Sequence, residues 1–344
     1  MASSIQQKVF ETARAAAGVE LLVSLPALNE EKTVAEVIRA IPRDLPGVDR
    51  VRVLVVDDGS TDQTADRARS AGADVISHHR SRGVGAAFHT ALRYGIDYGA
   101  DLIVTIDADG QFDAADIPAL IQPVISGEAD FATASRFKDP TVTPRIPWIK
   151  KWGNRTMSWL ISRLVGQRFW DVSCGFRCYS QKAALNLHLM GRFTYTQEVF
   201  MNLAFKQLRI VEVPVRVRGV RSHGKSRVAS NLFHYASNTL RIIFRCYRDY
   251  QPLRFFGAIA LMLTVPAVGL GGFLLWHYLD TGSFSPHKWA GFTGGALIVL
   301  ALMMLHMGMT GDMMNRHRVY LEELLYHRRV QSLGQRRKGS EKKE

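Results

Sequence analysis

Residues 102–113 read LIVTIDADGQFD, a run of apolar and β-branched residues followed at once by two aspartates, a glycine and a glutamine. The same order recurs in residues 51–62, VRVLVVDDGSTD, and in residues 21–30, LLVSLPALNE. Short runs of this composition favour buried strands, and the polar residues after them mark the strand ends. Helical patterns at Glu31–Ile41 and Thr61–Ala71 separate the runs, so the sequence predicts an α/β domain with a Rossmann-like, mostly parallel sheet. The strands are expected at Leu21–Leu25, Val51–Val56, Asp74–Ser77, Leu102–Ile106 and Asp130–Ala134.

The polar residues at the strand ends indicate where the functional site lies. In parallel α/β sheets, ligands collect at the carboxyl ends of the strands. Here those ends carry residues 26–30, 57–60 and 107–110. Asp107 and Asp109 supply two carboxylates that suit a hard cation such as Mg²⁺ or Mn²⁺, with diphosphate oxygens as its other ligands. A pair of aspartates in an ordinary turn is the alternative interpretation.

The charge of the chain is unevenly distributed. Residues 1–135 contain 12 Lys or Arg and 20 Asp or Glu, whereas residues 136–344 contain 32 and 11. A basic second half indicates attraction to anionic lipid headgroups and phosphorylated substrates. Nucleic acid is not an expected partner, because no recognition motif accompanies the charge. The three cysteines are too few for a disulfide framework, which favours a reducing compartment.

Two stretches are long and apolar enough to cross a membrane. Residues 255–278 and 289–310 contain no Asp, Glu, Lys or Arg, and each suits a tilted helix across a hydrocarbon core of about 30 Å. Buried helices of a soluble protein are the alternative. Arginines flank the pair on its outer sides, while Lys288 is the one basic residue of the connecting loop. This asymmetry predicts an integral protein of an inner, plasma or ER-like membrane, with the α/β domain and both termini cytoplasmic.

The sequence therefore predicts five regions. They are an N-terminal extension without a secretory signal (1–18), the α/β domain (19–228), a juxtamembrane interfacial helix (229–254), two transmembrane helices (255–311) and a basic cytoplasmic tail (312–344). The segment 145–155, which includes Lys151, mixes basic residues with tryptophans and isoleucines, and suits either a headgroup-level surface or a solvated amphipathic helix. The two spans fit a lone hairpin or one part of a homo-oligomeric bundle.

Six segments carry a resemblance to a known family: LPALNE, VVDDGSTD, DADGQF, SRF, DVSCGFR and RSHGKSR, in that order along the chain. Together they resemble family-two glycosyltransferases of the GT-A fold, and most closely the dolichyl-phosphate or polyprenyl-phosphate sugar synthases, the dolichol-phosphate mannosyltransferase type. The resemblance extends from about Leu21 to Arg227, and the paired C-terminal stretches fit the branch with a two-helix anchor. It implies a metal-dependent, inverting transfer of a monosaccharide from a GDP- or UDP-linked nucleotide-sugar donor to a polyprenyl or dolichyl phosphate.

The resemblance also implies roles for individual residues. It implies nucleotide binding by Pro26, Asn29, Glu30, Asp58 and Asp107, and a metal site of Asp107, Asp109 and Gln111. It implies phosphate or acceptor binding by Arg136, Lys151, Arg221, Ser226 and Arg227, and catalytic positions at Asp109, Asp171 and Arg136. The family often shows Asn-x-Gly-Lys-Gly where this chain has Ser81-Arg82-Gly83-Val84-Gly85, so a basic contact there would have to come from Arg82.

Other functions fit the sequence less well. A processive polysaccharide synthase shares the nucleotide-binding half, but it needs further spans and usually a Gln-x-x-Arg-Trp motif. A non-catalytic membrane scaffold is disfavoured by the intact Asp58, Asp107 and Asp109. For transfer to a lipid phosphate we expect no obligatory general base, since a phosphate with its second pKa near about 6 is already a nucleophile at neutral pH. Asp171 and Glu198 are the carboxylates that the resemblance places nearest the acceptor.

Overall fold

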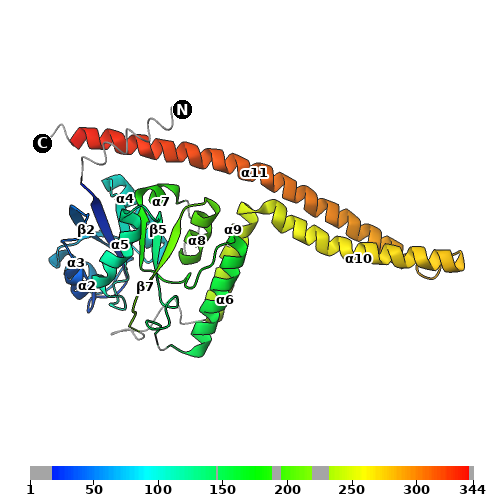
Figure 1. Ribbon diagram of the computed structural model, residues 1–344, viewed down its shortest axis with the longest axis horizontal. Helices are drawn as coiled ribbons and strands as arrows, with labels where there is room; N and C mark the ends of the chain where they lie inside the picture. Colours follow the sequence, from blue (N-terminus) through cyan, green and yellow to red (C-terminus); the bar gives the residue numbers. More distant parts are fainter. Residues whose placement is uncertain (1–17, 145, 188–194, 219–231, 341–344) are drawn as a thin grey trace. The chain divides into compact units, whose positions relative to one another are not determined.

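The computed structural model describes residues 18–144, 146–187, 195–218 and 232–340 (Figure 1). These residues form two compact units. The first comprises the described residues up to Ile243 together with those from Tyr326 onward, and the second comprises Phe244–Leu325. The sheet lies in the first unit, and the apolar stretches at 255–278 and 289–310 lie in the second.

The strands are β1 (Glu20–Ala27), β2 (Arg50–Asp57), β3 (Asp74–Ser77), β4 (Leu102–Thr105), β5 (Phe131–Ser135), β6 (Arg177–Ser180) and β7 (Ile210–Pro214). The helices are α2 (Val34–Ala40), α3 (Thr64–Ser70), α4 (Val84–Tyr98), α5 (Ile117–Ile125), α6 (Trp148–Val165), α7 (Gln181–Asn186), α8 (Thr196–Phe205), α9 (Leu232–Tyr250), α10 (Pro252–Thr281) and α11 (Lys288–Ser340). All five predicted strands are present, each with its ends within two residues of the prediction.

The seven strands form one sheet in the order β3-β2-β1-β4-β6-β5-β7. β6 is antiparallel to both of its neighbours, and the remaining pairs are parallel. This confirms the predicted α/β class with a mostly parallel sheet. The register pairs Ala27 with Asp57 and Thr105 with both Ser24 and Arg177. The carboxyl ends of β1, β2 and β4 therefore meet the amino end of β6 at one edge of the sheet.

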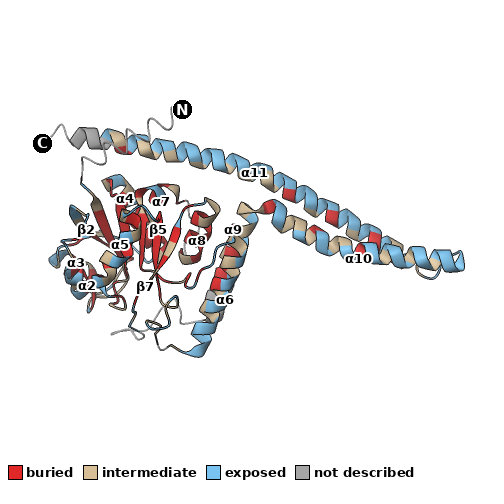
Figure 2. Ribbon diagram, viewed as in Figure 1, coloured by how far each residue is buried: buried red, intermediate tan, exposed pale blue. Residues whose placement is uncertain are grey.

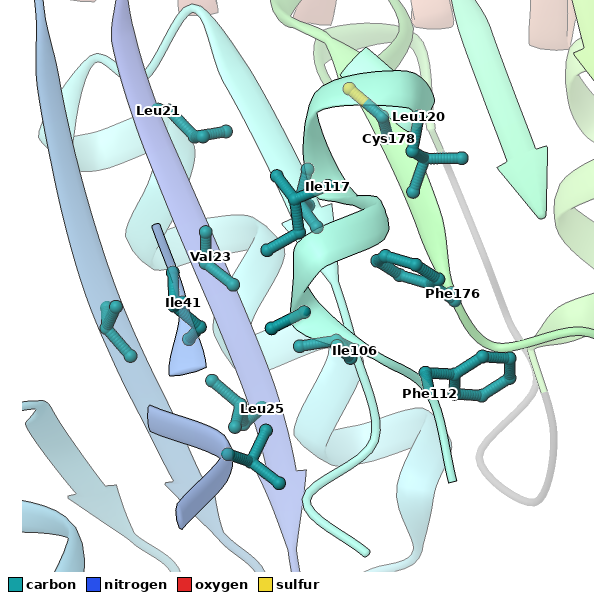
Figure 3. Packing of buried hydrophobic residues seen from close by; sticks show 14 of the residues in the cluster. Leu21, Val23, Leu25, Ile41, Ile106, Phe112, Ile117, Leu120, Phe176 and Cys178 are labelled. Atoms are coloured by element: carbon teal, nitrogen blue, oxygen red, sulfur yellow. The ribbon is translucent and has the colours of Figure 1, made fainter. Parts of the chain in front are cut away.

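The main core lies between one face of the sheet and helices α2 and α5. Leu21, Val23 and Leu25 alternate along β1, all 0% exposed, and belong to this cluster. Figure 3 shows Ile117 and Leu120 of α5 in the same layer. Burying one such aliphatic side chain contributes about 1.5–3 kcal/mol. The alternation thus decides which face of each strand is covered by helices.

Helix α4 covers the opposite face and comes close to the sheet at Gly95. A Cβ on Gly95 would lie 2.5 Å from Ile103 Cδ1 and 3.0 Å from Leu22 Cδ2. We expect Gly95→Ala to lower the free energy of unfolding by about 1–3 kcal/mol through overpacking, although alanine favours helices by about 1 kcal/mol. Gly153→Ala in α6 is the matched control, because a Cβ there has no neighbour within 4 Å. Chemical unfolding of both variants in detergent checks this, and equal stabilities would contradict it.

The last turns of α11 belong to the first unit. Arg329 Nη1 donates a hydrogen bond to the carbonyl oxygen of Leu185 at 2.7 Å, and Leu333 is 3% exposed. The region predicted as a basic tail (312–344) is helical up to Ser340. Within the segment predicted as an interfacial helix (229–254), α9 covers Leu232–Tyr250, and residues 252–254 already belong to α10. The interfacial position of α9 stays a prediction.

Helices α10 and α11 are long and apolar enough to cross a membrane. Of their most apolar stretches, 6% in α10 and 17% in α11 is buried within the chain. Figure 2 shows most of both helices exposed in the second unit. Small residues let them approach each other, since a Cβ on Gly294 would lie 3.3 Å from the Ala267 carbonyl oxygen. Contacts of this kind are typical of paired membrane helices.

Candidate active site

Asn29 joins the loops that follow β1 and β2. Its backbone N–H donates to Ser60 Oγ at 2.9 Å, and its side-chain oxygen accepts the backbone N–H of Thr61 at 2.8 Å. The backbone of Asn29 is left-handed (φ 53°), a conformation that asparagine tolerates better than most residues. The N–H of Glu30 then donates to Thr64 Oγ1 at 2.8 Å, at the start of α3. The predicted nucleotide-binding residues after β1 are therefore held beside the end of β2.

Asp58 is 4% exposed, and its carboxylate is surrounded by donors from the loop before α4. It accepts hydrogen bonds from the N–H groups of Arg82 and Gly83, from the Ser81 hydroxyl at 2.8 Å and from His78 Nδ1 at 2.7 Å. Burial alone would raise the pKa of Asp58, but the hydrogen bonds from Arg82, His78, Ser81 and Gly83 outweigh it and lower that pKa. Asp58 thus holds the loop that carries Arg82, while its predicted contact with the nucleotide stays a prediction.

We expect Asp58→Asn to lower the stability at neutral pH by about 1.5–3 kcal/mol, the usual contribution of hydrogen bonds to a charged group. A carboxyl whose pKa is lowered by folding stabilises the protein above its unfolded pKa, and this contribution is lost as the pH falls through the folded pKa. The stability difference between wild type and variant should therefore shrink below about pH 4. Urea unfolding at pH 7 and at acid pH checks this, and a difference that does not change with pH would contradict it.

Asp107 and Asp109 stand directly after β4, as predicted. Asp109 is 2% exposed, and its Oδ1 accepts the backbone N–H of Gln111 at 3.0 Å, which shapes the turn. A Cβ on Gly175 would lie 3.2 Å from Asp107 Oδ2, so the Asp107 carboxylate lies against the bare backbone of Gly175. Thr33 Oγ1 donates to the Ala108 carbonyl at 2.7 Å and ties this turn to α2.

The donor set of this turn fits a divalent cation bound together with phosphates. Asp107 and Asp109 provide carboxylate oxygens, the ligands that Mg²⁺ and Mn²⁺ accept. Among the described residues, no group of three or more His, Cys, Asp or Glu could hold a metal. A cation here would take its remaining ligands from substrate phosphates and water, which is how Mg²⁺ is usually bound. The side chain of Gln111, also predicted as a ligand, belongs to the same turn.

Arg136 and Asp171 form a two-pronged ion pair at the end of β5. Arg136 Nε lies 2.6 Å from Asp171 Oδ2, and Arg136 Nη2 lies 2.9 Å from Oδ1. The backbone N–H of Arg136 also donates to Oδ2 at 3.2 Å, and that of Ser173 donates to Oδ1. Asp171 is 0% exposed, whereas the Arg136 side chain is 25% exposed. The structure thus brings these two predicted catalytic residues together, with Asp171 holding Arg136.

The segment after β7 returns to the turn that contains Asp109. Val217 forms an antiparallel bridge with Phe112, and the N–H of Arg218 donates to the Gln111 carbonyl at 3.0 Å. Arg221, Ser226 and Arg227 come next in the sequence and lie outside the described residues. Lys151 is exposed in the first turn of α6. Within the described part of the chain, no hydrogen bond or ion pair joins Lys151 to the strand-end groups.

Three residues of this region received no site role from the sequence: Glu212, and Gly175 and Arg177 of the DVSCGFR segment. Arg177, at the start of β6, is 0% exposed, and Glu212 in β7 is 7% exposed. A lone ionisable residue inside an otherwise apolar strand, as in Ile210–Pro214, is the sequence signal that could have pointed to Glu212. Glu198, in the first turn of α8, is also 7% exposed.

The α/β unit is similar to known proteins. A model of the family described as glycosyl transferase family 2 matches residues 23–187. The UDP-N-acetylglucosamine–dolichyl-phosphate N-acetylglucosaminyltransferase of Methanococcus voltae is 31% identical over 212 residues, which are 56% of this chain and 83% of that protein. The dodecaprenyl-phosphate galacturonate synthase of Rhizobium johnstonii is 26% identical over 315 residues, 87% of this chain and 88% of that protein.

A solved structure is similar in fold as well. Glucosyl-3-phosphoglycerate synthase from Mycobacterium tuberculosis, in complex with Mn²⁺, UDP-glucose and phosphoglyceric acid, aligns with a TM-score of 0.52 and 25% identity. The alignment covers 68% of this chain and 81% of that one. The similarity therefore extends over most of the α/β unit, which is where the strand-end residues lie.

Proposed function

Because the chain belongs to glycosyl transferase family 2, as its motifs predicted, we propose that it transfers a monosaccharide from a nucleotide sugar to a polyprenyl phosphate. The observation that carries the proposal is the pair Asp107 and Asp109 at the end of β4, in a chain that also has two helices apolar enough to cross a membrane. The relative whose alignment covers 87% of this chain is named for a dodecaprenyl-phosphate product, which supports a lipid phosphate as acceptor.

The donor is bound at the carboxyl edge of the sheet. The base and ribose of the nucleotide are bound by four residues, directly or through the loops that these residues position: Pro26, Asn29, Glu30 and Asp58. Asp107, Asp109 and Gln111 are assigned to a divalent cation, Mg²⁺ or Mn²⁺, which would neutralise charge on the departing nucleoside diphosphate when bound. The UDP in the names of one relative and of the similar solved structure supports testing UDP-linked donors before GDP-linked ones.

The acceptor phosphate is assigned to basic groups. Arg136 lies at the same edge of the sheet, fixed by Asp171, with part of its side chain exposed. Arg221, Ser226 and Arg227 follow the segment that pairs with residues 111–112, which supports their assignment to phosphates. Lys151 on α6 is assigned to lipid headgroups or to the approaching acceptor. The α/β unit and both chain ends are proposed to be cytoplasmic, at the inner face of the membrane.

The proposed reaction is one displacement at the anomeric carbon, with inversion. A phosphate oxygen of the lipid attacks while the bond to the nucleoside diphosphate breaks. The chain's own groups hold the reactants at the right distance and balance the charge that leaves with the diphosphate. No proton has to be removed from the attacking phosphate at neutral pH.

A donor screen tests the proposal. The full chain in lipid nanodiscs is incubated with Mn²⁺, polyprenyl phosphate and single UDP- or GDP-sugars, and the lipid extract is analysed by mass spectrometry. The expected result is a polyprenyl-phosphate monosaccharide from one class of donor, and none when the lipid phosphate is replaced by the corresponding alcohol. Hydrolysis of the donor alone, or growth of a polymer, would contradict the proposal.

A further inference from the structure

Two buried ionisable side chains bind the main chain of one loop, residues 170–176, which we name the 170–176 loop. Glu212 comes from β7 and Arg177 from β6. Among the ion pairs of the described residues, none joins Glu212 to Arg177. Charged groups are rarely buried without a specific partner. Moving one charged side chain from water into a protein interior costs roughly several kcal/mol. Both side chains form hydrogen bonds with peptide groups of the loop.

Glu212 binds the amides at the beginning of the loop. Its Oε1 accepts the N–H of Asp171 at 2.8 Å, and its two oxygens lie 3.1 and 2.9 Å from the N of Trp170. Burial is the largest influence on the Glu212 carboxyl and raises its pKa, as does the nearby Asp171 carboxylate, while the two amides and the Ser135 hydroxyl act in the opposite direction. The Glu212 backbone carbonyl accepts a further hydrogen bond from Lys138 Nζ at 2.7 Å.

Arg177 binds the carbonyls in the later part of the loop. Its Nε donates to the Cys174 carbonyl at 2.7 Å, and its Nη2 donates to the Val172 carbonyl at 3.2 Å. The guanidinium is enclosed by aromatic rings, with the centroids of Phe131, Tyr195 and Phe200 between 5.1 and 5.7 Å from its central carbon. The rings shield it from water and offer their negative faces to the charge.

The loop between these two anchors contacts both halves of the candidate active site. Asp171, near its beginning, forms the two-pronged pair with Arg136. Gly175, near its end, lies against the carboxylate of Asp107. A shift of the loop would therefore move the guanidinium of Arg136 and the carboxylate of Asp107 at the same time.

We propose that Glu212 and Arg177 are positioning residues that hold the 170–176 loop in the geometry needed for sugar transfer. The inference rests on the proposed function, because it assigns Arg136 and Asp107 to the reacting groups. A hydrogen bond in which one partner is charged is stronger than one between two neutral groups. This applies to the amides bound by the Glu212 carboxylate and to the carbonyls bound by the Arg177 guanidinium. Misplacing reacting groups by about 1 Å is enough to lower an enzyme's rate on the order of 100-fold.

Glu212→Gln is the main test. The amide has the shape of the carboxylate, and its oxygen can still accept the N–H of Asp171. Its NH2 group is a donor, however, and would stand where Oε2 now accepts the N–H of Trp170 at 2.9 Å. We expect kcat to fall about tenfold or more, with little change in the affinity for the nucleoside diphosphate. The melting temperature should fall only slightly, because the lost hydrogen bond to the Trp170 amide is offset by the removal of a buried ionisable carboxyl. Glu128→Gln, on an exposed residue, is the matched control for the loss of charge.

Arg177→Lys is the second variant, since one ammonium group cannot donate to the Val172 and Cys174 carbonyls as the planar guanidinium does. It should also lower kcat, and Arg39→Lys, on an exposed residue, is its control. If Arg177→Lys does not fold, the Glu212→Gln result still decides the inference. Unchanged kcat in Glu212→Gln, or a loss of kcat only in proportion to the folded fraction, would overturn it.

Hydrogen exchange separates this inference from the proposed function. In Glu212→Gln the amides of residues 170–173 should exchange faster than in wild type, while those of β1 and β2 keep their protection. This readout needs no turnover, so it stands even if the wild-type chain fails to transfer a sugar to polyprenyl phosphate. Exchange at residues 170–173 that equals wild type would show that Glu212 does not hold the loop.

Discussion

Asp109→Asn is expected to lower turnover on the order of 10²–10³-fold, the usual cost of removing one group that stabilises developing charge. Asp109 is almost completely buried at the end of β4, and its Oδ1 already accepts the N–H of Gln111. Asparagine can keep that hydrogen bond, so the turn should persist. It removes a full negative charge from the proposed metal site, which is why the loss should appear in metal-dependent donor binding.

The measurement is calorimetric titration of the nucleoside diphosphate with and without Mn²⁺, followed by turnover. Wild type should bind more tightly with Mn²⁺, and the variant should lose most of that difference while its metal-free affinity is kept. Asp113→Asn is the matched control, because Asp113 lies in the same turn and its carboxylate accepts the N–H of Ala115 instead. An unchanged Mn²⁺ dependence in Asp109→Asn would remove Asp109 from the metal site.

The parallel part of the fold could be predicted from the sequence because its strands are short apolar runs closed by polar residues. β1, β2 and β4 each follow this pattern, and each lies within two residues of its predicted position. β6 could not be found in the same way, since its four residues, Arg177–Ser180, begin with an arginine and end with a serine. Its strand character comes from pairing with β4 and β5, which is a tertiary effect.

The candidate site was predictable to the extent that it consists of strand ends. Asp107 and Asp109 follow directly from the position of β4. The partners of Asp171 did not follow, because Arg136 and Glu212 are 35 and 41 residues away along the chain. Asp58 was predicted to meet the nucleotide, and no pattern indicated that its carboxylate also binds the loop before α4. A side chain that binds the backbone amides of a distant segment places no requirement on which residue types carry those amides. Such a contact therefore leaves no pattern in the sequence.

The other large effect concerns Asp171. Asp171→Asn is expected to lower turnover on the order of 10²-fold or more through the displacement of Arg136. Breaking a buried ion pair by removing one partner costs about 3–5 kcal/mol, so the melting temperature should fall as well. Asp130→Asn is the matched control: Asp130 pairs with Arg209 at the opposite end of the same strand, and its side chain is 8% exposed. That variant should lose stability and keep its turnover per folded molecule.

The same variant decides whether the reaction needs a general base. Both oxygens of Asp171 are bound by Arg136, so the carboxylate orients a cation and is poorly placed to accept a proton. If the lipid phosphate is the nucleophile without help, the rate of wild type should fall below about pH 6, where that phosphate becomes protonated. Asp171→Asn and Glu198→Gln should keep this acid limb at a lower overall rate, together with weaker donor or acceptor binding. Single-turnover rates from pH 5 to pH 8, measured beside donor and lipid affinities, test this. A variant that binds metal, donor and lipid as wild type does, and yet transfers no sugar at any pH, would identify a base and overturn this mechanism.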